Sequence, residues 1–208
     1  MSAVGSGEPG RTGLAAPVRL RIRIEGIVQG VGFRPFVHGL ADEYGLAGFV
    51  GNDPEGVFVE AEGPPDALDA FLAGLEHRAP LLARVEKVTA EAAEPTGERG
   101  FSIVASSTGG GRRTLIPPDT ATCAACLAEV LDPGDRRYGY PLTNCTDCGP
   151  RFTIVTDVPY DRRATTMAAF PLCADCAREY ADPGDRRFHA EPVCCPRCGP
   201  SVTFLRPD

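Results

Sequence analysis

Hydrophobic residues recur at two different periods in the first half of the chain. In residues 18–25 apolar side chains alternate with arginines, which is the period of two of a half-buried strand. In residues 33–45 they return every three or four positions, as on one face of a helix. The same criteria predict a second helix over 67–78 and further strands over 47–52, 56–63, 84–94 and 101–104.

The order of these elements predicts a fold. Strand, helix, strand, strand, helix, strand, with one short extra strand, indicates an antiparallel sheet with both helices on one face, an α+β ferredoxin-like βαββαβ arrangement. Residues 1–17 carry no apolar core, so they are expected to be a disordered lead-in and not a secretory signal. Residues 106–119 are rich in glycine and proline and have no period, which is typical of a linker.

The second half repeats itself after 50 residues. The hexapeptide DPGDRR occurs at 132–137 and again at 182–187, and no cysteine precedes Cys123. Each copy holds C-x2-C, then 18 residues, then C-x2-C, a spacing typical of tetrahedral zinc. Four thiolates fill the coordination shell, so two structural zinc ions are expected. The predicted ligands are Cys123, Cys126, Cys145 and Cys148 in one copy and Cys173, Cys176, Cys195 and Cys198 in the other.

These quartets predict a small, irregular, tandem zinc-ribbon-like domain with modules at 120–158 and 159–208. Three points about the ligands stay open. The ninth cysteine, Cys194, could replace Cys195, although the alignment of the repeats favours Cys195. His189 could ligate in principle, but a surface or packing role is favoured. Ligands could also pair within each repeat or across the two.

A glycine-rich loop, GIVQGVGFR at 26–34, joins the first strand to the first helix. Free backbone N–H groups and the helix dipole make such a loop an anion site in principle. Arg34 lies in the first turn of the helix, where a cation is unfavourable by about 0.3–1 kcal/mol unless an anion is bound beside it. From local sequence alone, an anion site and an ordinary glycine turn with an exposed arginine are equally favoured. Local sequence also favours Asn52, in GFVGNDPEG, as a turn residue.

Taken together, GIVQGVGFR and the later GFVGN on a βαββαβ pattern resemble the acylphosphatase signature. The resemblance implies an acylphosphatase-like domain at 18–105, in which the loop amides and Arg34 bind phosphate and Asn52 positions the attacking water. An acyl phosphate expels a carboxylate whose conjugate acid has a pKa of about 4, so no general acid is needed. The loop residues so implied are Val28, Gln29, Gly30, Val31, Gly32 and Phe33.

The combination of that domain with two cysteine modules, and with NCTDCGPRFTIV, PYDRRATTM and DRRFHAEP, resembles the hydrogenase-maturation carbamoyltransferases HypF over about residues 18–208. The resemblance implies hydrolysis of carbamoyl phosphate to carbamate and phosphate. It also implies a partner, the HypE protein, whose C-terminal cysteine the family carbamoylates with ATP. The domains for those later steps would lie beyond Asp208, so ATP-dependent adenylation and transfer are expected to be absent.

Two other functions remain: a general acylphosphatase with a zinc-ribbon protein-binding module, and a non-enzymatic zinc-finger adaptor. The net charge of −7 argues against a nucleic-acid partner, and no stretch approaches the roughly 20 apolar residues of a membrane helix. A cytoplasmic location follows, where disulfides are rare. Because the glycine loop and Asn52 both precede residue 106, hydrolysis is expected to need only the first domain and to be independent of zinc.

Overall fold

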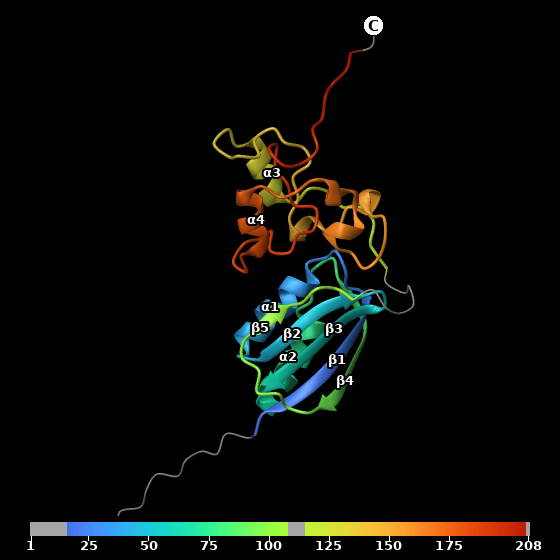
Figure 1. Ribbon diagram of the computed structural model, residues 1–208, viewed down its shortest axis with the longest axis vertical. Coiled ribbons are helices and arrows are strands. Elements are labelled where there is room, and N and C mark those ends of the chain that lie inside the picture. The colour runs from blue at the N-terminus through green and yellow to red at the C-terminus, as the bar shows by residue number, and fades with distance from the viewer. Residues whose placement is uncertain (1–15, 108–114, 207–208) are drawn as a thin grey trace, which may run out of the picture.

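The computed structural model describes residues 16–107 and 115–206, and Figure 1 shows them as two bodies stacked end to end. We call residues 18–103 the sheet domain and residues 115–206 the cysteine-rich half. Most of the predicted lead-in and the middle of the predicted linker lie outside the described residues. Both ends of that linker make contacts, because Ser106 accepts a hydrogen bond from Arg34 and Asp119 accepts one from the backbone of Phe152.

The sheet domain contains the five predicted strands, which are β1 (Val18–Ile27), β2 (Ala47–Asp53), β3 (Gly56–Gly63), β4 (Arg84–Ala93) and β5 (Phe101–Ile103). Their order across the sheet is β4-β1-β3-β2-β5. The pairs formed among β1–β4 are all antiparallel, as predicted. The short β5 lies parallel to β2 at the edge, so the sheet is mixed.

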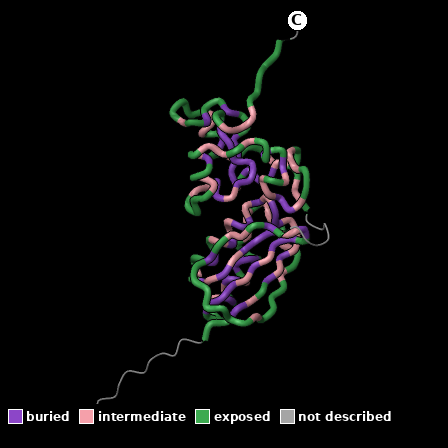
Figure 2. Tube along the Cα trace, viewed as in Figure 1, coloured by how far each residue is buried: buried purple, intermediate pink, exposed green. Residues whose placement is uncertain are grey.

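Two helices, α1 (Phe33–Glu43) and α2 (Pro65–His77), pack against each other and against the sheet. The alternation holds in the second part of β1, where Ile22 and Ile24 are buried while Arg21 is exposed. Arg19 departs from it, because it is buried in ion pairs with Glu60 and Glu62. The core lies between the sheet and the helices, where Figure 2 shows the buried stretches of the strands. This packing fixes the end of the sheet at which the loop between β1 and α1 meets the cysteine-rich half.

The cysteine-rich half has the irregular character predicted for it. Its two α-helices, α3 (Ala124–Leu131) and α4 (Ala174–Ala181), occupy equivalent positions in the two repeats. Between them run turns and short 3₁₀ helices at Thr146–Cys148, Phe152–Ile154, Arg162–Ala164 and Thr166–Ala169. Across 16–107 and 115–206, no helix has both the length and the apolar content that crossing a bilayer requires.

Candidate functional site

The glycine-rich loop forms a tight turn between β1 and α1, and we call residues 28–33 the cradle. Gly30 and Gly32 both have φ of 74°, a left-handed conformation that glycine adopts without a steric penalty. Val28, Val31 and Phe33 are buried in the core below the turn. Their anchoring leaves the backbone of the glycines at the surface of the sheet domain, facing the cysteine-rich half.

Gln29 ties the cradle to both halves of the molecule. Its side-chain nitrogen donates to the carbonyl oxygens of Asp53, at 2.7 Å, and Gly56, at 2.8 Å. Its side-chain oxygen accepts a hydrogen bond of 2.9 Å from the backbone N–H of Tyr160. Gln29 was predicted as a cradle residue for its backbone, whereas the structure gives its side chain a bracing role.

Arg34 lies at the start of α1 and is buried between two carboxylates of the cysteine-rich half. Its Nη1 donates to Oδ1 of Asp161 at 2.9 Å, and its Nη2 donates to Oε1 of Glu191 at 2.6 Å. Burial alone would lower the pKa of Arg34, but the charges of Glu191 and Asp161 outweigh burial and raise it. The guanidinium therefore stays charged, and in this state it binds carboxylates of the same chain.

Glu191 is itself held on several sides. It accepts hydrogen bonds from the hydroxyl of Tyr180, at 3.1 and 3.2 Å, and from the backbone N–H of Arg162, at 2.9 Å. Burial raises the pKa of Glu191, while the charge of Arg34 acts in the opposite direction. A buried carboxylate with this many donors is firmly positioned.

Asn52, near the end of β2, is almost completely buried. Its side-chain Oδ1 is a buried acceptor that has no hydrogen-bond partner among the described residues. Buried polar groups without partners are uncommon in folded proteins, so each one calls for an explanation. The structure brings Asn52 and Arg34, predicted from separate motifs, to the wall of one hollow.

That hollow lies between the two halves. Its volume is about 20 Å³, which holds about one water molecule. The cradle forms one wall, and residues such as Asn144, Thr146 and His189 form the other. The fit is close at the cradle, because a Cβ added to Gly30 would lie 2.7 Å from Cβ of Pro150. The cysteine-rich half supplies the opposite wall and the two carboxylates that bind Arg34. That hydrolysis needs only the first domain stays a prediction.

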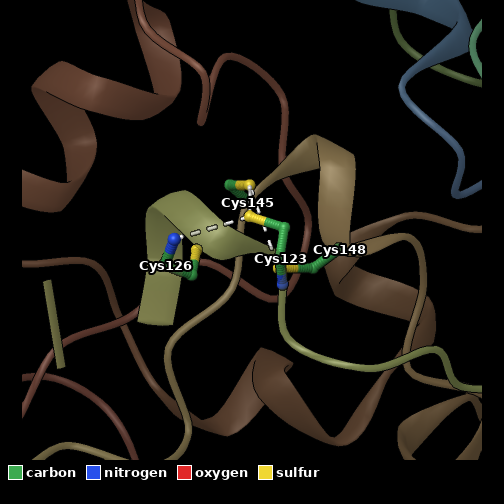
Figure 3. A group of neighbouring side chains, drawn as sticks. All are labelled: Cys123, Cys126, Cys145 and Cys148. Carbon is green, nitrogen blue, oxygen red and sulfur yellow. Dashed lines mark hydrogen bonds between the residues drawn. The ribbon is translucent and has the colours of Figure 1, made fainter. Parts of the chain in front are cut away.

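The eight predicted zinc ligands form two quartets, one from each repeat. Within each quartet the four Sγ atoms lie within 4.8 Å of one another. Several of the Sγ–Sγ distances are 3.6–3.9 Å. A tetrahedron with Zn–S bonds of 2.3 Å requires a separation of about 3.8 Å, so the quartets fit zinc. Figure 3 shows the first of them: Cys123, Cys126, Cys145 and Cys148. Each ion is thus bound within one repeat, which resolves the alternative of pairing across repeats.

The two DPGDRR segments brace the quartets reciprocally, a role that sequence analysis did not assign. Arg186 of the second repeat donates to Sγ of Cys126 at 3.0 Å, and Arg136 of the first donates to Sγ of Cys176 at 3.4 Å. Neighbouring arginines pair with a glutamate of the other repeat, as Arg187 does with Glu129. A zinc ion with four thiolates carries two net negative charges, so each arginine compensates the charge of the other module's site.

Cys194 lies outside both quartets, as the repeat alignment favoured. Its Sγ is buried 3.5 Å from the hydroxyl of Tyr140. The packing role favoured for His189 is also confirmed, because its ring contacts those of Tyr180 and Phe188 with centroids 4.9 and 4.7 Å apart. His189 also lines the hollow, a position that no local sequence pattern indicated.

Replacement of Cys194 by serine is expected to leave two zinc ions per chain, because both quartets keep all four thiolates. The serine hydroxyl can also keep a hydrogen bond to Tyr140. Elemental analysis of purified, metal-replete protein measures the zinc content directly. Cys195→Ser is the matched control and should lose metal. Loss of zinc from the Cys194 variant would contradict the ligand assignment.

Comparison with known proteins places these features in a family. Residues 20–103 match the acylphosphatase family, and residues 122–155 and 172–205 match the HypF finger. The carbamoyltransferase HypF of Rhodobacter capsulatus is 54% identical over 154 residues, covering 73% of this chain and 20% of that protein. The acylphosphatase of Thermus thermophilus is 46% identical over 86 residues, covering 41% of this chain and 97% of that enzyme.

A solved structure leads to the same assignment. The crystal structure of full-length HypF in its phosphate- and nucleotide-bound form has a TM-score of 0.89 and 46% identity, and the match covers 94% of this chain and 26% of that one. The chain spans about a fifth of the length of the carbamoyltransferases that it matches. With an acylphosphatase domain followed by two zinc fingers, the chain belongs to the HypF family.

Proposed function

We propose that this chain hydrolyses carbamoyl phosphate to carbamate and phosphate at the hollow between its two halves. The observation that carries the proposal is that Arg34, Asn52 and the cradle line one hollow in an acylphosphatase fold, with Oδ1 of Asn52 lacking a partner among the described residues. Its relatives support the choice of substrate, because they are carbamoyltransferases. A solved HypF is described as binding phosphate and nucleotide, which fits an acyl phosphate as ligand.

In this structure the hollow holds about one water molecule and Arg34 is paired with Asp161 and Glu191, so the proposed mechanism begins with a widening of the hollow that frees the guanidinium. The backbone N–H groups of the cradle and the guanidinium of Arg34 then bind the phosphoryl oxygens. Asn52 Oδ1 accepts a hydrogen bond from a water molecule and so aims its oxygen at phosphorus. That oxygen forms the new P–O bond while the bond from phosphorus to the carbamoyl oxygen breaks, and the protons of the water remain with the phosphate product. The leaving carbamate departs as an anion and needs no proton, so binding and orientation carry the reaction. Carbamate then decomposes to carbon dioxide and ammonia.

Two structural zinc ions hold the cysteine-rich half in shape, and in this proposal they take no part in the chemical step. We assign ATP-dependent transfer to a HypE-type partner to the parts of the longer relatives that this chain does not span. The proposed setting is the cytoplasm, where the thiolates remain reduced and available to zinc.

The test compares phosphate release from carbamoyl phosphate by the full chain and by Asn52→Ala. Loss of the group that orients water is expected to lower kcat about 10²-fold, since misplacement of a reactant by about 1 Å has effects of that size. Inhibition by inorganic phosphate should be retained, because Arg34 and the cradle are unchanged. A zinc-loaded chain that releases phosphate from neither carbamoyl nor acetyl phosphate would instead indicate a non-enzymatic adaptor.

A further inference from the structure

Two further polar side chains that line the hollow have no assigned role, and both come from the cysteine-rich half. They are Asn144 and His189, whose Oδ1 and Nδ1 atoms are buried without a hydrogen-bond partner in the part of the chain that the structure describes. Asn144 is only 2% exposed. Its Nδ2 donates to the carbonyl oxygen of Gly149 at 3.4 Å, which leaves Oδ1 as the unpaired end of the amide. A buried acceptor without a hydrogen bond has lost its hydration without compensation, which is unfavourable. A ligand that donates a hydrogen bond to it would recover part of that free energy.

At the positions of Asn144 and His189 the two internal repeats carry different residues. The two copies align residue for residue, and Asn144 stands where the second copy has Cys194. His189 stands where the first copy has Gly139. Gly139 has φ of 65° and His189 has φ of 51°, so the backbone conformation is common to both copies. It favours glycine, and the second copy places an imidazole there despite the strain.

The protonation state of His189 allows its ring to accept a hydrogen bond. Burial, helped by the nearby charge of Arg34, lowers the pKa of His189 to about 4. The ring is therefore neutral near pH 7, and a neutral imidazole has one nitrogen that accepts a hydrogen bond. Asn144 and His189 line the same hollow as Arg34, and both side chains are uncharged near pH 7, so they suit a neutral hydrogen-bond donor better than a second cation.

We propose that Asn144 and His189 make this site selective for an acyl phosphate whose acyl carbon carries an amino group. The inference rests on the proposed function and adds the residues that would choose the substrate. The amino group of carbamoyl phosphate offers two N–H donors, whereas the methyl group of acetyl phosphate offers none. A site built to accept hydrogen bonds from a substrate N–H discriminates strongly against an analogue that lacks it, because the buried acceptors are then left unpaired. The cysteine-rich half thus supplies specificity and the sheet domain supplies the phosphate site.

The experiment measures kcat/KM for carbamoyl phosphate and for acetyl phosphate with the full, zinc-loaded chain and two variants. Asn144→Leu removes the acceptor and keeps the approximate volume. His189→Gly removes the imidazole and restores the residue that the first copy uses, which relieves backbone strain. In each variant the ratio of the two kcat/KM values is expected to fall about tenfold or more, with turnover of acetyl phosphate retained. Zinc content should stay at two ions per chain.

Thr143→Val is the matched control. Thr143 also has a buried side-chain oxygen that lacks a partner among the described residues, but it does not line the hollow, so its replacement should leave the ratio unchanged. An unchanged ratio in both Asn144→Leu and His189→Gly would overturn the inference and leave the proposed function intact. An equal fall in Thr143→Val would also overturn it. Failure of the unaltered chain to hydrolyse either substrate would reject the proposed function together with the inference.

Discussion

Replacement of Arg34 by alanine is expected to lower the hydrolysis of carbamoyl phosphate by about 10²–10³-fold or more, the range seen when one preorganised donor is removed from a transition state. Arg34 is the one permanent cation among the described residues that line the hollow. In the Arg34→Ala variant, therefore, only the backbone N–H groups of the cradle would remain to stabilise the phosphoryl oxygens. Phosphate release under saturating substrate measures the effect, and inhibition by inorganic phosphate should weaken in parallel.

The structure adds a second effect that the motif alone did not suggest. Arg34 is the charged partner of both Asp161 and Glu191, and Glu191 is almost fully buried. Removal of one partner from a buried ion pair typically costs about 3–5 kcal/mol, because it leaves a buried charge without compensation. The contact between the two halves should therefore weaken in Arg34→Ala, while the core of the sheet domain remains folded. A lower unfolding temperature and faster proteolysis between the halves would report this change.

Two further variants separate the chemical effect from the structural one. Arg34→Lys keeps the charge but cannot offer a planar fork, so it should restore stability better than activity. The double variant Arg34→Ala with Glu191→Gln removes the uncompensated charge and should recover part of the lost stability without recovering turnover. Near-normal turnover in Arg34→Ala would remove this residue from the proposed mechanism.

The elements of the sheet domain were predictable because hydrophobic periodicity is a local property. The observed helix boundaries differ from the predicted ones where a glycine or a proline determines the backbone conformation. The first helix ends at Glu43, before the predicted limit of 45, and Gly45 follows with φ of 63°. The second helix starts at Pro65 because proline suits the first turn, where its missing N–H has no partner to lose.

The zinc ligands were predictable for a similar reason, since C-x2-C spacing places two thiolates on one turn. The contacts around the candidate active site were not. Arg34 and Glu191 are 157 positions apart, and no local pattern indicates that they meet. The 50-residue repeat did contain a usable signal. The first copy has Gly139 where the second has His189, and His189 lines the hollow.

Replacement of Cys126 by serine is expected to remove zinc from both modules. The first quartet loses a thiolate, and structural zinc contributes about 10–16 kcal/mol of apparent binding free energy to such small domains. Arg186, which belongs to the other repeat, loses its 3.0 Å contact with Cys126. Arg187 depends on Glu129 in the same first module. Collapse of that module therefore leaves two arginines of the second module without their partners.

Zinc content is expected to fall from two ions toward zero, and the cysteine-rich half should become sensitive to protease. The sheet domain should stay resistant, because its core contains residues of that domain alone. Cys176→Ser is the matched variant, since Arg136 contacts Cys176 at 3.4 Å in the same reciprocal way, and it should also lose both ions. A Cys126→Ser chain that keeps one zinc ion, bound as tightly against a chelator as before, would show that the modules fold independently. Loss of both ions from either variant would instead indicate that the two zinc fingers fold as one cooperative unit. Arg136 and Arg186, each of which contacts the quartet of the other repeat, would then connect them.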